Sequence, residues 1–463
     1  MTLRIIMKAA TLLMTIALLN VVSARELPPV GSEPKAFKVP ASTTLSLRNG
    51  VKVTLVPFGT IPKTTISITV PAGNRYEGDQ AWLADLAGQM LTEGAGARDA
   101  DQLAAASADM GGEIGVGVTV DTTSAGLDVL SEFAPDAIAL LADVLQRPTL
   151  PAQQFDRVRG NLLKNLAIAR QQPQTQADGV FRKQLFRDHP YSVGLPDPAA
   201  FESITIADVR RFIEQNYAAN GTRIYVAGQF DRAAVVAAIE HMFGGWKTVE
   251  RPALVPPPTA AAPGRHFIAR PDAPQSTLYL GLPVVDPTHP DHTKVSVMNT
   301  LLGGSFSSRV TSNIREDKGY TYSPRSRVSV NKSSGYWVQT ADVTTNVTGP
   351  AIDEIINEIE RLRAEPPAAE ELDRIKNYRT GTFILGNATR GGLIGQLQFL
   401  DTHGLDKAHL ESAVQRINAV SPADVQAMAE RYLNLDDMTL VVVGDPAIVP
   451  EQLDAIDRLA PAQ

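Results

Sequence analysis

Residues 82–94 read Trp-Leu-Ala-Asp-Leu-Ala-Gly-Gln-Met-Leu-Thr-Glu-Gly, and residues 65–70 before them read Thr-Ile-Ser-Ile-Thr-Val. In the earlier stretch polar and apolar side chains alternate, which is typical of a strand with one buried face. In the later stretch the apolar residues recur with the spacing of one helix face. They are Leu83, Leu86, Ala87, Met90 and Leu91. The order strand then amphipathic helix is the unit from which we predict the fold.

The second half of the chain repeats this order of elements. A strand-like run at 276–282 precedes a helical segment at 295–302, and each half ends in another strand-like run, 223–228 and 438–444. Three matching pairs occur at offsets of 217, 215 and 221 positions: Asp156/Asp373, Leu141/Ile356 and Asp121/Asp342. An ordered series of this kind indicates a duplicated unit.

A proline- and alanine-rich stretch, residues 251–264, separates the two halves, and clustered prolines favour an extended connector. We therefore predict an N-terminal domain at 41–250 and a C-terminal domain at 265–463. The fold class that we expect is α+β, with two homologous domains. Each domain should be an antiparallel sheet with helices packed on one face.

The N-terminus has the pattern of a secretory signal peptide over residues 1–24. Arg4 and Lys8 precede an apolar run that ends in small residues. The run is too short to favour a permanent membrane span, with a signal anchor as the alternative. A polar lead follows at 25–40, and no cysteine is available for lipid attachment. We expect a periplasmic or secreted protein without a stable membrane anchor.

Charge and cysteine content exclude several kinds of site. The formal net charge is -7 and the isoelectric point is near 5.6, without a basic stripe of the kind that nucleic acids need. We therefore expect no nucleic-acid partner. The absence of cysteine excludes disulfides and thiolate metal sites.

Three segments of the first half resemble the start of an insulinase/pitrilysin metallopeptidase. They are Asn49-Gly50, residues 72–77 (Ala-Gly-Asn-Arg-Tyr-Glu) and the helix at 82–94. In active members of that family this helix carries His-x-x-Glu-His. The two histidines share one helix face and bind zinc, and the glutamate serves as general base.

The family's zinc residues are replaced in this chain. When the helix is aligned on the Met-Leu pair after the motif, Asp85 stands at the first ligand position, Gly88 at the base and Gln89 at the second ligand. Downstream, Asn165 falls where the third ligand is expected. A catalytic zinc normally has three protein ligands, so the resemblance implies no metal in this chain. The alternative for Asp85 and Gln89 is a plain polar position on the open side of the helix.

The second half departs less from the family. Residues 301–309 (Leu-Leu-Gly-Gly-Ser-Phe-Ser-Ser-Arg) and 313–323 resemble its second signature, in which an arginine and a tyrosine reach the substrate. Arg315 and Tyr322 match those two positions. A guanidinium and a phenol can both donate to a peptide carbonyl that becomes negative. The alternative is that Arg315 pairs with a nearby carboxylate and Tyr322 packs as a strand aromatic.

Gly303, Gly304 and Ser305 lie inside that signature. The glycines could bind an extended peptide or form a tight turn, and the sequence leaves both open. We predict that the three residues bind substrate.

Histidines do not supply another metal site. His289 and His292 form the only close pair and lie in a proline-flanked segment, where solvated histidines are expected. His189 is followed by Pro-Tyr, and we expect it to shape a turn.

Taken together, the resemblance implies the fold of mitochondrial processing peptidase and a role as non-catalytic subunit of a zinc metallopeptidase heterodimer. The chain itself would carry no cofactor, and zinc is expected in a homologous partner with the intact motif. Arg315 and Tyr322 would act in trans on unfolded peptides. The alternative is a catalytically inactive peptide-binding or scaffold protein of the same fold.

Overall fold

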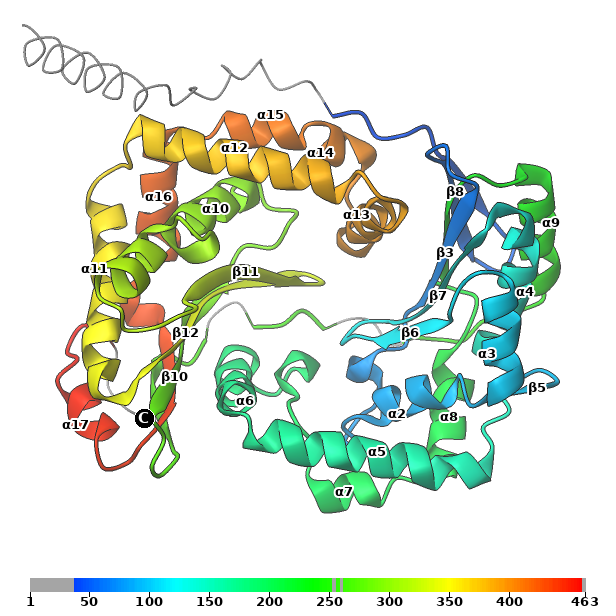
Figure 1. Ribbon diagram of the computed structural model, residues 1–463, viewed down its shortest axis with the longest axis horizontal. Helices are drawn as coiled ribbons and strands as arrows, with labels where there is room; N and C mark the ends of the chain where they lie inside the picture. Colours follow the sequence, from blue (N-terminus) through cyan, green and yellow to red (C-terminus); the bar gives the residue numbers. More distant parts are fainter. Residues whose placement is uncertain (1–36, 252–254, 259–260, 460–463) are drawn as a thin grey trace, which may run out of the picture. The chain divides into compact units, whose positions relative to one another are not determined.

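The computed structural model describes three stretches of the chain: 37–251, 255–258 and 261–459. The predicted signal peptide, the polar lead as far as residue 36 and two pieces of the linker, 252–254 and 259–260, lie outside the described residues. Among the helices that the structure does describe, none combines the length and hydropathy needed to cross a membrane. Figure 1 shows the element order from Phe37 onward.

The first half contains a six-stranded sheet in the spatial order β1, β2, β8, β3, β7, β6. The strands are β1 Thr43–Ser46, β2 Lys52–Pro57, β3 Lys63–Val70, β6 Gly115–Val118, β7 Thr123–Leu130 and β8 Arg223–Gly228. Strand β3 alternates as predicted, with Ile66, Ile68 and Val70 fully buried. All neighbouring strands are antiparallel except β2 and β8, which run parallel. A separate two-stranded ribbon pairs β4 Gly94–Ala95 with β5 Arg98–Asp99.

The first half also contains helices, all of which except α6 contribute buried residues to the core on one face of this sheet. They are α2 Leu83–Met90, α3 Ala100–Asp109, α4 Ala134–Gln146, α5 Ala152–Gln171, α6 Pro173–Phe186, α7 Pro198–Glu202, α8 Ile206–Asn216 and α9 Arg232–Phe243, with 3-10 turns η1 Asn74–Tyr76, η2 Ser131–Phe133 and η3 Pro190–Ser192. Capping boxes begin two of them: Asp99 with Gln102 at α3, and Thr205 with Asp208 at α8. The helix predicted near residue 83 is buried on its apolar face, as expected.

The second half contains a five-stranded sheet in the order β11, β12, β10, β13, β9. The strands are β9 Gly264–Ala269, β10 Gln275–Val284, β11 Arg325–Asn331, β12 Ser334–Thr344 and β13 Thr439–Gly444. Again one pair, β13 with β9, is parallel and the others are antiparallel. The predicted α+β class with two helix-packed sheets is confirmed, but each sheet is mixed rather than purely antiparallel.

The helices of the second half follow the same plan. They are α10 His292–Asn299, α11 Thr348–Ala364, α12 Ala369–Gly386, α13 Arg390–His403, α14 Lys407–Glu411, α15 Ala413–Asn418, α16 Pro422–Tyr432 and α17 Val449–Asp454. Short segments complete them: π-helical η4 Thr300–Gly304 and η5 Thr311–Asp317, and 3-10 turns η6 Thr345–Val347 and η7 Leu435–Asp437. Apolar residues of α11 recur at helical spacing and are all buried: Ile352, Ile355, Ile356, Ile359 and Leu362.

One threonine–aspartate pair marks the duplication more accurately than the sequence offsets did. Thr65 on β3 lies opposite Asp128 on β7, and its hydroxyl donates to that carboxylate. In the second half Thr277 on β10 lies opposite Asp342 on β12 and makes the same bond. Asp128 is therefore the counterpart of Asp342. The predicted match with Asp121 was wrong, because Asp121 lies in the turn before β7 rather than on a strand.

Each sheet also receives a helix from the other half of the chain on its second face. Helix α6 of the first half packs Phe181 and Leu185 among buried residues of β10, β12 and β13. Helix α13 of the second half packs Leu397 among buried residues of β2 and β8. The prediction of helices on one face only is thus incomplete. Only short connections lead into these helices, Gln172 between α5 and α6 and residues 387–389 between α12 and α13, and their apolar contacts join the two halves.

Candidate functional site

The helix at the degenerate zinc motif, α2, is fixed at its first turn by Glu77. The two oxygens of this carboxylate accept the backbone N–H groups of Trp82 at 2.9 Å and Ala84 at 3.0 Å. Free N–H groups at a helix start need such acceptors. Glu77 is only 5% exposed, and burial raises its pKa to about 7. This carboxyl group therefore has a structural role at the start of α2.

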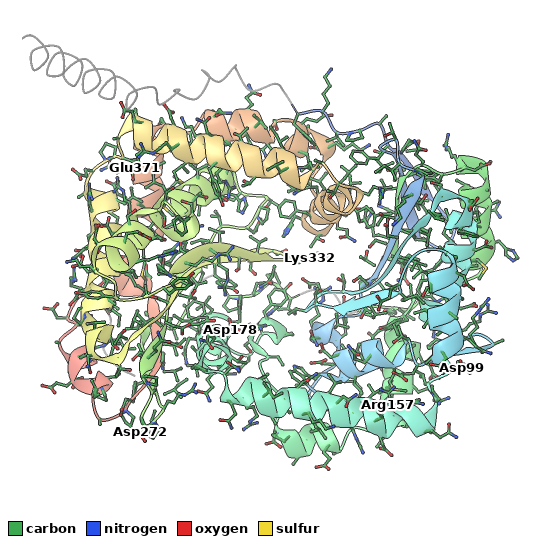
Figure 2. The ribbon with its side chains drawn as sticks, viewed as in Figure 1. Asp99, Arg157, Asp178, Asp272, Lys332 and Glu371 are labelled. Atoms are coloured by element: carbon green, nitrogen blue, oxygen red, sulfur yellow. The ribbon has the colours of Figure 1, made fainter. Side chains whose placement is uncertain are left out.

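Asp85 points into a cavity of about 190 Å³ between α2 and α6. The amide of Asn74 donates to Asp85 Oδ2 at 2.6 Å, and burial raises the pKa of Asp85. Asp178 and Arg182 line the same cavity from α6, and Asp178 is labelled in Figure 2. Asp85 is half-buried, so the interpretation as an open polar position is wrong for this residue.

The other zinc-motif positions do not converge on Asp85. Gln89 and Asn165 are exposed, on α2 and α5 respectively. A Cβ on Gly88 would lie 2.7 Å from a side-chain methyl of Val118 on β6. The position of the family's general base is thus crowded by a neighbouring strand, and a side chain there would require Val118 to shift.

The residues present do not fit a zinc ion. Asp85 is the one ionisable side chain at the four motif positions, and it already accepts from Asn74. Over residues 37–251, 255–258 and 261–459, no three His, Cys, Asp or Glu side chains gather as metal ligands. Two zinc ligands and the general base are therefore absent from the side chains at these positions. The base position is also crowded by its neighbour.

The second signature forms an exposed stack of one cation between two rings. The Arg315 guanidinium lies 4.4 Å from the ring centre of Phe306 and 4.9 Å from that of Tyr322. Phe306 is 69% exposed and Tyr322 is 78% exposed. Large apolar rings held at the surface by a cation are unusual unless they contact something else. Sequence reasoning missed Phe306, although it lies inside the quoted signature.

Arg315 also contacts the carboxylate next to it, with Nε 3.1 Å from Glu316 Oε1. The predicted alternative, a nearby carboxylate partner, is therefore present in part. The remaining guanidinium N–H groups and the Tyr322 hydroxyl have no hydrogen-bond partner among the described residues. Donors remain available for a peptide oxygen.

Gly303 and Gly304 end the π-helix η4, and both are packed against neighbouring residues rather than placed in an open turn. A Cβ on Gly303 would come within 2.5 Å of the Gln339 side chain, and one on Gly304 within 2.6 Å of Asn299. Glycine is needed here so that the π-helix η4 can approach its neighbours closely. Ser305 is buried, and its hydroxyl has no partner in the described part of the chain. Their binding of substrate remains a prediction.

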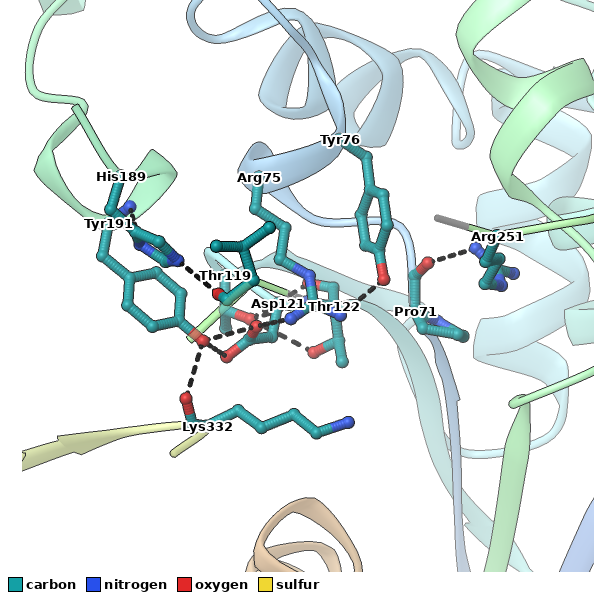
Figure 3. Close-up of polar contacts among 11 residues, drawn as sticks. Pro71, Arg75, Tyr76, Thr119, Asp121, Thr122, His189, Tyr191, Arg251 and Lys332 are labelled. Carbon is teal, nitrogen blue, oxygen red and sulfur yellow. Dashed lines mark hydrogen bonds and ion pairs between the residues drawn. The ribbon is translucent and has the colours of Figure 1, made fainter. Parts of the chain in front are cut away.

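A polar network joins the two halves beside the degenerate helix (Figure 3). The Tyr191 hydroxyl donates to Asp121 at 3.0 Å and lies 3.2 Å from the carbonyl oxygen of Lys332, in the β11–β12 hairpin. Arg75 pairs with Asp121 at 2.8 Å. Sequence reasoning did not find this network, because its members lie far apart along the chain.

His189 shapes a turn, as predicted. Its Nδ1 accepts the backbone N–H of Tyr191 at 3.1 Å, so Nε2 carries the proton and donates to the Val255 carbonyl at 2.9 Å. His289 and His292 lie in one turn, in which the His292 N–H donates to the His289 carbonyl at 3.1 Å. Their side chains have different surroundings, since His289 Nδ1 accepts the N–H of Asp291 whereas His292 lines a cavity between helices. Burial lowers the pKa of His292 to about 4, so the expectation of a solvated histidine was wrong for this residue.

The first and second signatures are not joined directly. Within the described residues, no hydrogen bond, ion pair or ring contact links Arg315 or Tyr322 to α2. The two signatures are therefore separate elements: the helix α2 with its replaced zinc positions in the first half, and an exposed arginine–aromatic stack in the second.

Two models of one peptidase family match successive parts of the chain. Residues 56–199 match the model of the insulinase family (peptidase family M16), and residues 203–378 match the peptidase M16 inactive domain. An uncharacterized zinc protease of Mycobacterium tuberculosis (strain H37Rv) is 25% identical over 445 residues, which cover 92% of this chain and 98% of that protein.

Solved structures share the architecture over most of the chain. The peptidase M16 inactive domain from Pseudomonas fluorescens has a TM-score of 0.81 and 25% identity, covering 87% of this chain and 98% of that one. A chain of complex III from Candida albicans has a TM-score of 0.75 and 15% identity, covering 90% and 97%. The second likeness shows the fold alone. The two family models and the full-length relatives agree, and the chain belongs to the insulinase family of peptidases, family M16.

Proposed function

We propose that the chain is the zinc-free subunit of a peptidase pair and binds unfolded peptides for a homologous partner that carries the intact zinc motif. Arg315 and Tyr322 would donate to the peptide carbonyl oxygen and stabilise its negative charge in the transition state. The observation that carries this proposal is the contrast between the closed Gly88 position and the exposed stack around Arg315.

The closed position argues against catalysis by this chain alone. A general base at residue 88 would have to displace Val118 from its place on β6. Gln89 and Asn165 carry no charge and lie exposed, so neither can replace a histidine or glutamate ligand. Peptide hydrolysis therefore has to draw its attacking water from another subunit.

The stack supports the role of positioning and charge stabilisation. Phe306 and Tyr322 both contact the guanidinium, which limits its rotamers before substrate arrives. A donor that is already oriented loses less entropy when it meets the developing oxyanion. Both rings are also exposed enough to contact apolar side chains of an unfolded peptide.

Hydrolysis of an unstructured fluorogenic peptide tests this function directly. Three samples with zinc are compared: this chain alone, a homologue from the same genome with His-x-x-Glu-His alone, and the two together. We expect cleavage from the mixture only. Arg315→Ala in this chain should lower kcat/KM of the mixture by roughly 100-fold or more, the usual loss for one oxyanion donor.

Arg374→Ala serves as the matched control, because Arg374 is exposed on α12 and outside the stack. It should leave the rate unchanged. If the homologue cuts equally well alone, the shared-site function is wrong. Peptide binding by this chain without faster cleavage in the mixture would instead favour an inactive peptide-binding scaffold, which the exposed rings would also suit.

A further inference from the structure

A second cavity, of about 390 Å³, lies among the helices of the C-terminal half. Its lining residues belong to α10, α12, α13 and the α14–α15 segment, and Figure 1 shows how these helices are arranged. One wall is apolar and is formed by Phe383, Phe399, Leu410, Ala413 and Ile417. The ionisable side chains that line it are His292, Arg379, His409 and Arg416. Among the described residues, no aspartate or glutamate lines this cavity.

Arg379 is a cation without a counter-ion at this cavity. Its Nε is shielded from solvent and has no hydrogen-bond partner in the described part of the chain, and NH1 makes only a long 3.4 Å contact to the Thr300 hydroxyl. Burial lowers the pKa of Arg379. A buried guanidinium is costly unless a carboxylate or other acceptor satisfies it. The cavity therefore has an unfilled requirement for an anion.

The charge of Arg379 also acts on His292 in the same cavity. Burial first, and then the nearby charge of Arg379, lower the pKa of His292 to about 4. Two carboxylates whose charges act on the cavity histidines already have local partners: Asp286 accepts from Thr288, and Asp406 caps α14 by accepting the N–H of His409. Neither is paired with Arg379.

Arg416 is already satisfied, unlike Arg379. Its guanidinium donates to the hydroxyls of Thr293 and Ser412 and to the His409 carbonyl. One free cationic group therefore faces the cavity beside an apolar wall. A single planar guanidinium matches a monoanionic carboxylate better than a dianionic phosphate, because the carboxylate has one charge and two oxygens in the same fork geometry.

The cavity is also a counterpart of the one beside Asp85. Ser296 and Thr300 follow Asp85 and Gln89 by 211 positions each, and Ser296 lines the C-terminal cavity as Asp85 lines the other. The wall residue Phe399 on α13 likewise follows Arg182 on α6 by 217 positions. Both halves of the duplicated fold thus leave space at this place, and only the C-terminal one is apolar and cationic.

We propose that this C-terminal cavity binds the carboxylate of an apolar acid, with Arg379 donating to the carboxylate and Phe383 and Phe399 packing against the apolar body. The volume lies in the range of small-molecule pockets. The carboxylate belongs either to a free small acid or to the C-terminal residue of a peptide. This site is independent of the proposed peptidase function, since it uses none of the residues of the arginine–aromatic stack.

Calorimetric titration of the full chain with 4-phenylbutanoate tests the site. We expect one-to-one binding, with 4-phenylbutanamide at least about tenfold weaker because the neutral amide cannot accept a charge-assisted pair of hydrogen bonds. Arg379→Gln should weaken the binding of 4-phenylbutanoate by about tenfold or more. Arg374→Gln, the same change at an exposed site of α12, should leave binding unchanged.

A second variant covers the case in which Arg379→Gln does not fold. Gly395 lines the cavity from α13, and a Cβ there meets no atom within 4 Å, so Gly395→Leu should fill the cavity and abolish binding. Gly391 is also on α13, and a Cβ there also meets no atom within 4 Å. The Gly391→Leu variant should therefore bind 4-phenylbutanoate as the unaltered chain does. Equal binding of the amide, or full binding by both cavity variants, would overturn the proposal, as would no binding of any carboxylate.

The source of the carboxylate follows from two further probes, the tripeptide Ala-Ala-Phe and its C-terminal amide. Tighter binding of the free-acid tripeptide than of 4-phenylbutanoate, lost on amidation, supports a peptide terminus. Binding of 4-phenylbutanoate without binding of the tripeptide supports a free small acid.

Discussion

Replacing Glu77 with glutamine isolates the effect of a buried acid at the start of the degenerate helix. Burial raises the folded-state pKa of Glu77 from 4.5 to about 7, so the native state favours the protonated acid. Stability from this preference is fully present below pH 4.5 and is lost as pH rises through 7. With about 1.4 kcal/mol for each pKa unit, the loss amounts to about 3 kcal/mol.

The assay is urea unfolding followed by tryptophan fluorescence at pH values from 4 to 8. We expect the free energy of unfolding of the unaltered chain to fall, relative to Glu77→Gln, by about 3 kcal/mol between pH 4 and pH 8. Glu77→Gln should also lower the free energy of unfolding by a constant amount at every pH. In the unaltered chain each carboxylate oxygen accepts a backbone N–H, and the glutamine NH2 that replaces one of these oxygens cannot accept it. Glu370→Gln, an exposed change on α12, should give a profile parallel to the unaltered chain. If the free energy of unfolding of Glu77→Gln also changed with pH in parallel with that of the unaltered chain, the assignment of a raised pKa to Glu77 would be refuted.

Three further predictions follow from single contacts. Gly88→Ala should destabilise the chain by about 1–3 kcal/mol in urea unfolding, because its Cβ would lie 2.7 Å from a methyl group of β6; an unchanged midpoint would mean that β6 yields freely. Tyr191→Phe should lower the free energy of unfolding by about 1–3 kcal/mol, because it removes the donor to Asp121. An unchanged free energy of unfolding would show that the network is not needed for folding. In the peptidase mixture, Phe306→Ala should lower kcat because Arg315 loses one of its two rings, whereas an effect on KM alone would indicate a role in peptide binding only.

Regular periodicity made much of the fold predictable, and its failures have physical causes. Strand β7 was missed because it reads Thr-Ser-Ala-Gly-Leu-Asp-Val-Leu, in which glycine and aspartate are poor strand formers. Its alternation becomes visible only when small residues such as Ala125 count as buried. The same omission led to Asp121 being matched with Asp342, because the strand that carries the true counterpart, Asp128, had not been recognised.

The exchange of helices between halves could not be read from the sequence. The spacing of Phe181 and Leu185 shows that one face of α6 is buried, but not against which sheet. The two parallel strand pairs are hidden for the same reason, since each joins segments far apart along the chain. Long-range contacts of this kind leave no local pattern.

For the candidate site too, some features could be predicted from the sequence and others could not. Loss of the zinc residues and retention of Arg315 and Tyr322 are properties of residue identity, so the sequence carries them. The closure of Gly88 by Val118 and the ring contact between Arg315 and Phe306 depend on packing, and only the structure reveals them.

The most direct test of the proposed shared site is the Tyr322→Phe variant in the mixture with the zinc-motif homologue. This change keeps the ring against Arg315 and removes only the hydroxyl donor. We expect kcat for peptide hydrolysis to fall by roughly 100-fold with little change in KM, because the donor acts on charge that exists only in the transition state. The control variant is Tyr378→Phe, at an exposed tyrosine of α12, and its mixture with the homologue should hydrolyse the peptide at the full rate. Full activity of Tyr322→Phe would contradict the claim that this chain supplies a catalytic donor to its partner.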